Sequence, residues 1–151
     1  MIEQSLIQYS DLDARIIEVA KEDLKKEQVD CPVTHFFGPG VYIRECTMPA
    51  NTRIIGHIHK ESHTNVMLTG KLLMLLEDGS TELFAAPMVY VAPPGRKVAL
   101  IVEDVTWQNI YATDETNIEI LEALLFDNGD FPLPYQQEKI NLEEKGKLCL
   151  E

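Results

Sequence analysis

The first thirty residues carry apolar side chains at helical spacing, with polar residues between them. Ser10 is a suitable N-cap for a helix, and Asp13 stands where a capping box places an acid. The pattern predicts a helix over residues 10–28, which either packs on the outside of its own domain or docks on a partner. Six side chains form its apolar stripe: Leu12, Ile16, Ile17, Val19, Ala20 and Leu24.

From Val33 onward the helical period gives way to short apolar runs of the kind that form strands. These runs are evenly spaced, and turns rich in glycine and proline separate them. No helical pattern intervenes, so we expect an all-β fold, either an antiparallel sandwich or a small barrel. The expected strands cover residues 33–37, 41–47, 53–59, 63–69, 71–77, 81–84, 88–92, 97–103 and 105–112.

A second helical signal follows these strands. Residues 116–119 form a capping box, and the residues after it present apolar side chains on one helical face. An alternating strand through Ile118 and Ile120 is the competing interpretation. The expected face consists of Ile118, Leu121, Leu124 and Leu125.

The pattern divides the chain into three parts. Residues 1–32 form an N-terminal helical arm, residues 33–127 a barrel with a closing helix, and residues 128–151 an extended tail. The tail begins with a proline-rich connector and continues with charged residues, so it either adds a strand to a neighbouring subunit or stays solvated.

Composition narrows the functional classes. The chain has 151 residues, 45% of them hydrophobic, and a net charge of -12. Such an acidic protein is a poor ligand for nucleic acid backbones and for anionic membranes. No signal peptide or membrane-spanning run is evident. Cys31, Cys46 and Cys149 are widely spaced and odd in number. We therefore expect reduced thiols in a protein that is not secreted.

Three of the four histidines fall within eight residues. His57 and His59 share one face of an expected strand, and His63 begins the next strand after a polar turn. Three imidazoles from adjacent strands match the ligand set of a divalent transition metal such as Zn, Fe, Ni or Mn. Neutral histidines would leave the ion its full charge and open positions, so the site would attract anions and acidify bound water. The alternative is that these are hydrogen-bonded interior histidines without a metal.

These residues resemble the two motifs of the cupin superfamily, the double-stranded β-helix or jelly-roll barrels. His57, His59 and Gly70 fit the first motif, in which His63 replaces the usual glutamate. Residues 93–95 fit the start of the second motif, but Val98 stands where the family has its fourth metal ligand. The resemblance spans residues 41–112 and implies the cupin fold, with Val98 as an apolar wall of the site.

Strand alternation adds further candidates for the pocket. Asn65 and Met67 share a face with His63, while Trp107, Asn109 and Tyr111 share a face of the last strand. Tyr111 is the candidate catalytic residue, as a general base or as a group that orients a ligand. The alternative for Trp107 and Tyr111 is aromatic filling of the core.

A narrower resemblance is to small cupin-like proteins encoded by tailed bacteriophages. The matching positions are residues 57–60, 63, 65, 70, 77–79, 94–95, 107 and 112–116. The resemblance implies a virion-associated or accessory structural protein with a metal site, found in the virion or host cytoplasm. Its partners would then be further copies of the chain or other virion proteins. The alternatives are a metal-dependent dioxygenase, lyase or sugar-modifying enzyme acting on a small anionic substrate, and a metal-free binder of a small molecule or carbohydrate.

Overall fold

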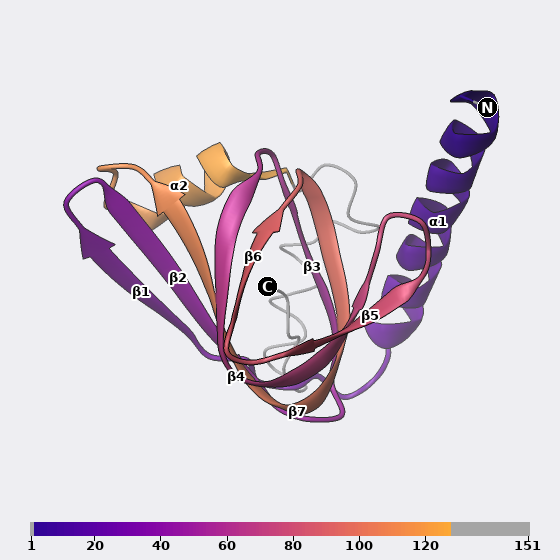
Figure 1. The fold of residues 1–151 in the computed structure, drawn as a ribbon, viewed down its shortest axis with the longest axis horizontal. Coiled ribbons are helices and arrows are strands. Elements are labelled where there is room, and N and C mark those ends of the chain that lie inside the picture. Colours follow the sequence, from indigo (N-terminus) through magenta and orange to yellow (C-terminus); the bar gives the residue numbers. More distant parts are fainter. Residues whose placement is uncertain (1, 128–151) are drawn as a thin grey trace.

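The computed structural model describes residues 2–127, and their side chains from Leu12 onward. A helix at each end flanks a curled set of strands (Figure 1). In chain order the elements are α1 (Ile2–Asp23), β1 (Val33–Gly38), β2 (Val41–Met48), β3 (Arg53–His59), β4 (His63–Leu75), β5 (Thr81–Ala85), β6 (Met88–Ala92), β7 (Gly95–Ala112), α2 (Ile118–Leu125) and β8 (Phe126–Asp127).

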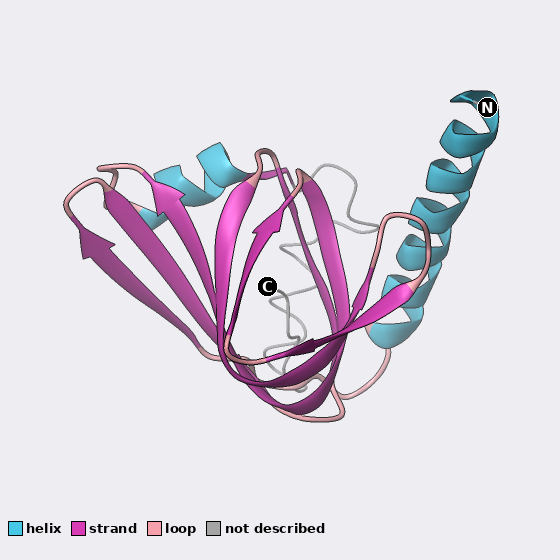
Figure 2. Ribbon diagram, viewed as in Figure 1, coloured by secondary structure: helices cyan, strands magenta, loops and turns pink. Residues whose placement is uncertain are grey.

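The strands form one antiparallel sheet that curls on itself (Figure 2). β7 is its central strand and pairs with β2, β3 and β4. β4 then pairs with β5 along its second half and with β6 along its first half. Because β4 and β7 contact each other over most of their lengths, the sheet closes into a cup, as the all-β prediction required.

The two longest strands each merge two strands that the sequence separates. We expected a tight turn at Gly70, but β4 continues through it with only a shift in register against β7. Gly70 has a φ of +88°, and a Cβ there would collide with the carbonyl oxygen of Asp104. The glycine is therefore required by a bend inside a strand, where two backbones approach each other closely.

The inside of the barrel has an apolar layer and a polar layer. The apolar layer is built from Cys46, Met48, Ile54, Met67, Leu72, Met74, Phe84, Ala99, Ile101, Val105 and Trp107. The buried polar side chains are Arg44, Thr52, His59, His63, Asn65, Lys97 and Asn109. Buried polar groups need partners, so this second group is where a functional site is expected.

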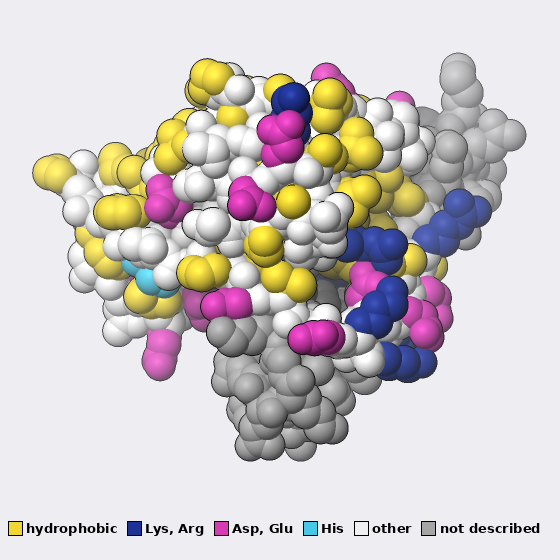
Figure 3. Space-filling model, turned by 90° about the horizontal axis from the view of Figure 1, so that it is seen from below, with side chains coloured by type: hydrophobic (Ala, Val, Ile, Leu, Met, Phe, Trp, Pro, Cys, Tyr) yellow, Lys and Arg dark blue, Asp and Glu magenta, His cyan; other side chains and the backbone are white. Residues whose placement is uncertain are grey.

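The C-terminal end of α1 contacts the barrel through an ion pair. Ala20 and Leu24 are buried, and Arg53 of β3 donates from Nη1 to the Asp23 carboxylate at 3.0 Å. In the view from below, several basic side chains gather at one side of the molecule beside acidic ones, and another lies apart from them (Figure 3). The helix begins at Ile2, so the expected start at Ser10 is wrong.

α2 begins one residue later than its capping box suggested. Asn117 is the N-cap, and its side chain accepts a hydrogen bond from the backbone N–H of Ile120. The expected apolar face is divided, because Leu121 is buried and Leu124 is exposed. β8 then pairs with β3 and returns the chain to the barrel. The expected roles of residues 128–151 lie outside the described residues.

Two expectations about location can be compared with the structure. None of the described helices has the length and hydrophobicity to cross a membrane. Cys46 is a buried thiol whose sulfur lies 3.8 Å from the carbonyl oxygen of Cys31. Cys31 itself is disulfide-bonded, so the expectation that all cysteines are reduced is wrong.

Candidate functional site

His59 and His63 face each other inside the barrel, at the end of β3 and the start of β4. They are only 2% and 6% exposed, and their rings stack with centroids 4.1 Å apart. The side chain of Lys97, from β7, reaches both rings. Its Nζ lies 2.9 Å from Nε2 of His63 and 3.3 Å from Nε2 of His59. Three residues from three strands therefore form one buried cluster, called here the lysine–histidine cluster.

The hydrogen bonds assign a proton to each ring. Nδ1 of His63 lies 3.1 Å from the carbonyl oxygen of Glu61, which can only accept, so Nδ1 carries the proton. Nε2 of His63 then presents its lone pair to Lys97. Nδ1 of His59 lies 2.8 Å from the Tyr111 hydroxyl, while its Nε2 also faces the lysine. Since an ammonium only donates, we assign both Nε2 atoms as acceptors and both rings as neutral.

The electrostatics of the cluster agree with this assignment. Burial and then the positive charge of Lys97 together lower the pKa of His63 to about 4. Burial and then Lys97 depress the pKa of His59 even more strongly, and His63, His57 and Arg44 add to the effect. Both imidazoles therefore stay neutral near pH 7 and can accept hydrogen bonds from a cation.

His57 does not join the lysine–histidine cluster. The register of β3 against β7 shifts between Ile55 and Ile58, which breaks the strict alternation on which the prediction relied. The His57 ring stacks instead on Phe126 of β8, with centroids 4.8 Å apart. Among the described residues, no group of three His, Cys, Asp or Glu side chains could hold one metal ion. The predicted three-histidine set does not fit this geometry, while metal binding by the protein stays an untested prediction.

Lys97 was not among the candidates that the sequence provided, whereas its neighbour Val98 was. Val98 lies in register with Ile55 of β3, and the residue before it carries its side chain to the histidines. Both faces of this strand are largely apolar, so alternation by itself did not distinguish them. The signal available in the sequence was the alternation of the strand, which places Lys97 on the same face as Ala99 and Ile101, both buried in the structure.

A buried amide network lies beside the cluster. Trp107 donates from Nε1 to Oδ1 of Asn65 at 3.1 Å, and the same oxygen accepts from Nδ2 of Asn109 at 2.6 Å. The indole can only donate, so it fixes the orientation of Asn65 and, through it, that of Asn109. Oδ1 of Asn109 therefore points elsewhere, and it is buried without a hydrogen-bond partner. Met67 belongs to the apolar layer.

Arg44 is the second buried cation that the sequence analysis missed. It is 6% exposed and lies directly opposite Asn109 in the pairing of β2 with β7. Its Nη1 is buried without a hydrogen-bond partner, and its guanidinium carbon lies 5.8 Å from the centre of the Phe126 ring. An arginine in phase with buried Cys46 and Met48 was the available signal.

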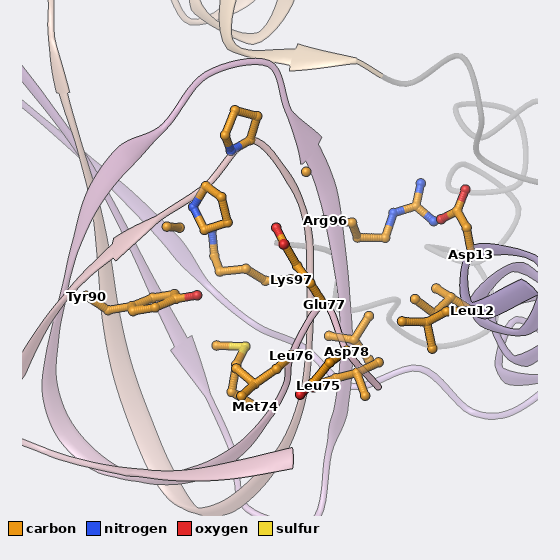
Figure 4. Close-up of a pocket in the computed structure, with 16 residues that line it drawn as sticks. Leu12, Asp13, Met74, Leu75, Leu76, Glu77, Asp78, Tyr90, Arg96 and Lys97 are labelled. Atoms are coloured by element: carbon orange, nitrogen blue, oxygen red, sulfur yellow. The ribbon is translucent and has the colours of Figure 1, made fainter. Parts of the chain in front are cut away.

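A pocket of about 890 Å³ opens beside the cluster, between the barrel and α1. Lys97, Tyr90 and Met74 line it from the barrel, and Leu12 and Asp13 line it from the helix (Figure 4). Because Lys97 belongs both to this pocket and to the cluster, the pocket provides a place for a molecule next to the buried polar side chains.

Comparison with known proteins defines the fold. No family model matches the sequence, and no curated protein matches it. The ectoine synthase of P. lautus shares 13% sequence identity at a TM-score of 0.50, over 69% of this chain and 85% of that one. A cupin domain from Bordetella pertussis Tohama I shares 19% identity at a TM-score of 0.46, over 58% and 98% of the two chains.

A third similar structure is an RmlC-like cupin family protein from Methanocaldococcus jannaschii, described as a double-stranded β-helix. It shares 13% identity at a TM-score of 0.47, over 56% of this chain and 82% of that one. The curled antiparallel sheet and the similarity to the ectoine synthase show the double-stranded β-helix fold, as the sequence motifs implied. At these identities the similarity establishes the fold only.

Proposed function

We propose that the protein binds a small anionic molecule inside its barrel and that Arg44 holds the negative group. The observation that supports this is the buried Nη1 of Arg44, which lacks a hydrogen-bond partner. A charged group taken out of water is strongly unfavourable unless it is paired and hydrogen-bonded. In the described part of the chain, the buried charged side chains besides the histidines are Arg44 and Lys97, both cationic. A bound anion would supply a negative charge for the Nη1 of Arg44.

The class of anion follows from the neighbour of Arg44. Oδ1 of Asn109 is a buried acceptor without a donor, and directly opposed side chains on paired strands have Cβ atoms about 5 Å apart. A ligand with an acidic group and a nearby hydroxyl could therefore accept from Arg44 and donate to Asn109. We infer a small hydroxy carboxylate as the ligand class.

A ligand series tests this proposal. Titration calorimetry at constant ionic strength should compare lactate and tartrate with the matched acids propionate and succinate, and with neutral glycerol and glucose. We expect the hydroxy acids to bind most tightly. Charge-assisted hydrogen bonds contribute about 1.5–3 kcal/mol, so Arg44→Gln should weaken binding about ten- to a hundredfold.

The matched control is Arg53→Gln, an arginine on β3 whose side chain is half exposed and paired with Asp23. This variant should bind the hydroxy acids as the wild type does. Equal binding of neutral sugars and acids, or no binding of any member of the series, would refute the proposal.

A second candidate function is catalysis, in which the protein would convert the anion that it binds. Tyr111, the candidate from sequence, contacts Nδ1 of His59, so it is placed to orient that ring. A reaction that uses the cluster would be lost in His63→Gln while the ligand still bound. Unchanged turnover in that variant would place the chemistry elsewhere.

A virion-associated role is a separate proposal, based on the resemblance to small phage cupin-like proteins. Among the strands that the structure describes, β6 pairs only with β4, and its Val89 and Val91 are 65% and 64% exposed. An edge strand with exposed apolar side chains is a surface on which another chain can dock. Stoichiometric copies of the protein in purified virions would support this role, and its absence from them would exclude it.

A further inference from the structure

The lysine–histidine cluster has the layout of a cation site, with a side-chain ammonium at its centre. Nε2 of His59 and Nε2 of His63 both turn toward Nζ of Lys97, at 3.3 and 2.9 Å. Each ring is held in this orientation by its other nitrogen, through Tyr111 and through the carbonyl oxygen of Glu61. Metal-ligating histidines are oriented by partners on the second nitrogen in the same way.

An ammonium and a metal ion cannot share this position. Transition metals need imidazole nitrogens at about 2.0–2.1 Å, and the two lone pairs here converge on an atom that already carries a positive charge. The only further histidine near the pair, His57, is stacked on Phe126. The described residues therefore offer two convergent imidazoles and a lysine where the prediction had three imidazoles and an ion.

We propose that the ammonium of Lys97 is the resident cation of this barrel and takes the place of a metal ion between His59 and His63. It keeps the two rings stacked and neutral without any bound ion, and it places a fixed positive charge at the pocket. Lys97 would have this role whether or not Arg44 binds an anion, so the two proposals can fail separately.

The first test uses the untagged wild-type protein. Elemental analysis after purification should find no stoichiometric transition metal. Titration with Zn²⁺ or Ni²⁺ at neutral pH should leave the imidazole ¹⁵N signals of His59 and His63 in place. A stoichiometric metal that shifts both signals would overturn the proposal. Because this test uses the wild-type protein alone, it does not depend on whether any variant folds.

The second test removes the ammonium. Lys97→Ala should gain a Zn²⁺ or Ni²⁺ site at least about tenfold tighter than that of the wild type, because the competing charge about 3 Å from the site is gone. The additional change His59→Ala should abolish the gain. Lys71→Ala removes a surface lysine that pairs with Glu103, and it should leave metal binding unchanged. A folded Lys97→Ala variant without any gain would contradict the assigned role of Lys97.

Discussion

The buried histidines make the stability of the fold depend on pH in a calculable way. His63 has an ordinary pKa of 6.5 when the chain is unfolded and a pKa of about 4 in the fold. Above pH 6.5 both states are neutral, and the histidine causes no loss of stability. Below pH 6.5 His63 becomes protonated in the unfolded chain, whereas it stays neutral in the folded protein until the pH approaches 4. The free energy of unfolding therefore falls with pH until the folded value near 4 is reached.

The size of this effect follows from the two pKa values. Each pH unit between them is worth about 1.4 kcal/mol, and the ordinary value lies 1.5 units above pH 5. His63 should therefore lower the free energy of unfolding by about 2 kcal/mol between pH 7 and pH 5. His59 has its pKa depressed in the same direction and adds to the loss.

Urea unfolding at a series of pH values measures this effect. Trp107 is the only tryptophan and is 1% exposed, so its fluorescence reports the loss of the barrel core. His63→Gln removes the titrating group, and its stability should fall by about 2 kcal/mol less over this interval than that of the wild type. The carboxylates titrate alike in both proteins and cancel in the comparison. Identical pH slopes would show that His63 is not buried as a neutral base.

Two pairs of substitutions test the fold. An alanine in the left-handed conformation lowers stability by roughly 1–2 kcal/mol. Gly70→Ala should lower it by clearly more, because its Cβ also collides with the neighbouring strand. Gly79→Ala should lower it only by the backbone strain, because its Cβ meets no atom within 4 Å. Thermal unfolding of both variants decides this, and equal costs would refute the close approach at Gly70. Leu121→Ala should cost about 2–5 kcal/mol because this side chain of α2 is buried in a cluster with Tyr42 and Tyr111. Leu124 is 59% exposed on the same helix, so Leu124→Ala should change stability by less than about 0.5 kcal/mol. A similar loss in both leucine variants would mean that α2 does not pack as described.

The strand content of the barrel could be predicted from the sequence because alternation and turn residues are local signals. The same is true of α2, whose apolar spacing and capping residues lie within a few positions of one another. The error at its start has a local cause, since Thr116 and Asn117 are adjacent and both can cap a helix. The continuation of one strand through Gly70 was not predictable from the sequence. This glycine is required by its close approach to the backbone of Asp104, which lies more than thirty residues further along the chain.

The candidate site was only partly determined by the sequence. The spacing of the histidines indicated that their side chains would come together, and the fold brings His59 and His63 into contact inside the barrel. A bulge in β3 removed His57 from the pair, and a strand distant in sequence inserted Lys97. Arg44 became a buried cation only through the pairing of β2 with β7.

There is a physical reason why the sequence predicted the elements but not the composition of the site. Which residues alternate, turn or cap depends on neighbours along the chain, so the sequence by itself determined the elements and the class of fold. Which charges meet inside the barrel depends on strand register and on bulges, where a shift of one residue moves a side chain to the opposite face. Only the tertiary structure decided that a lysine ammonium, and not a third imidazole, faces the two buried histidines.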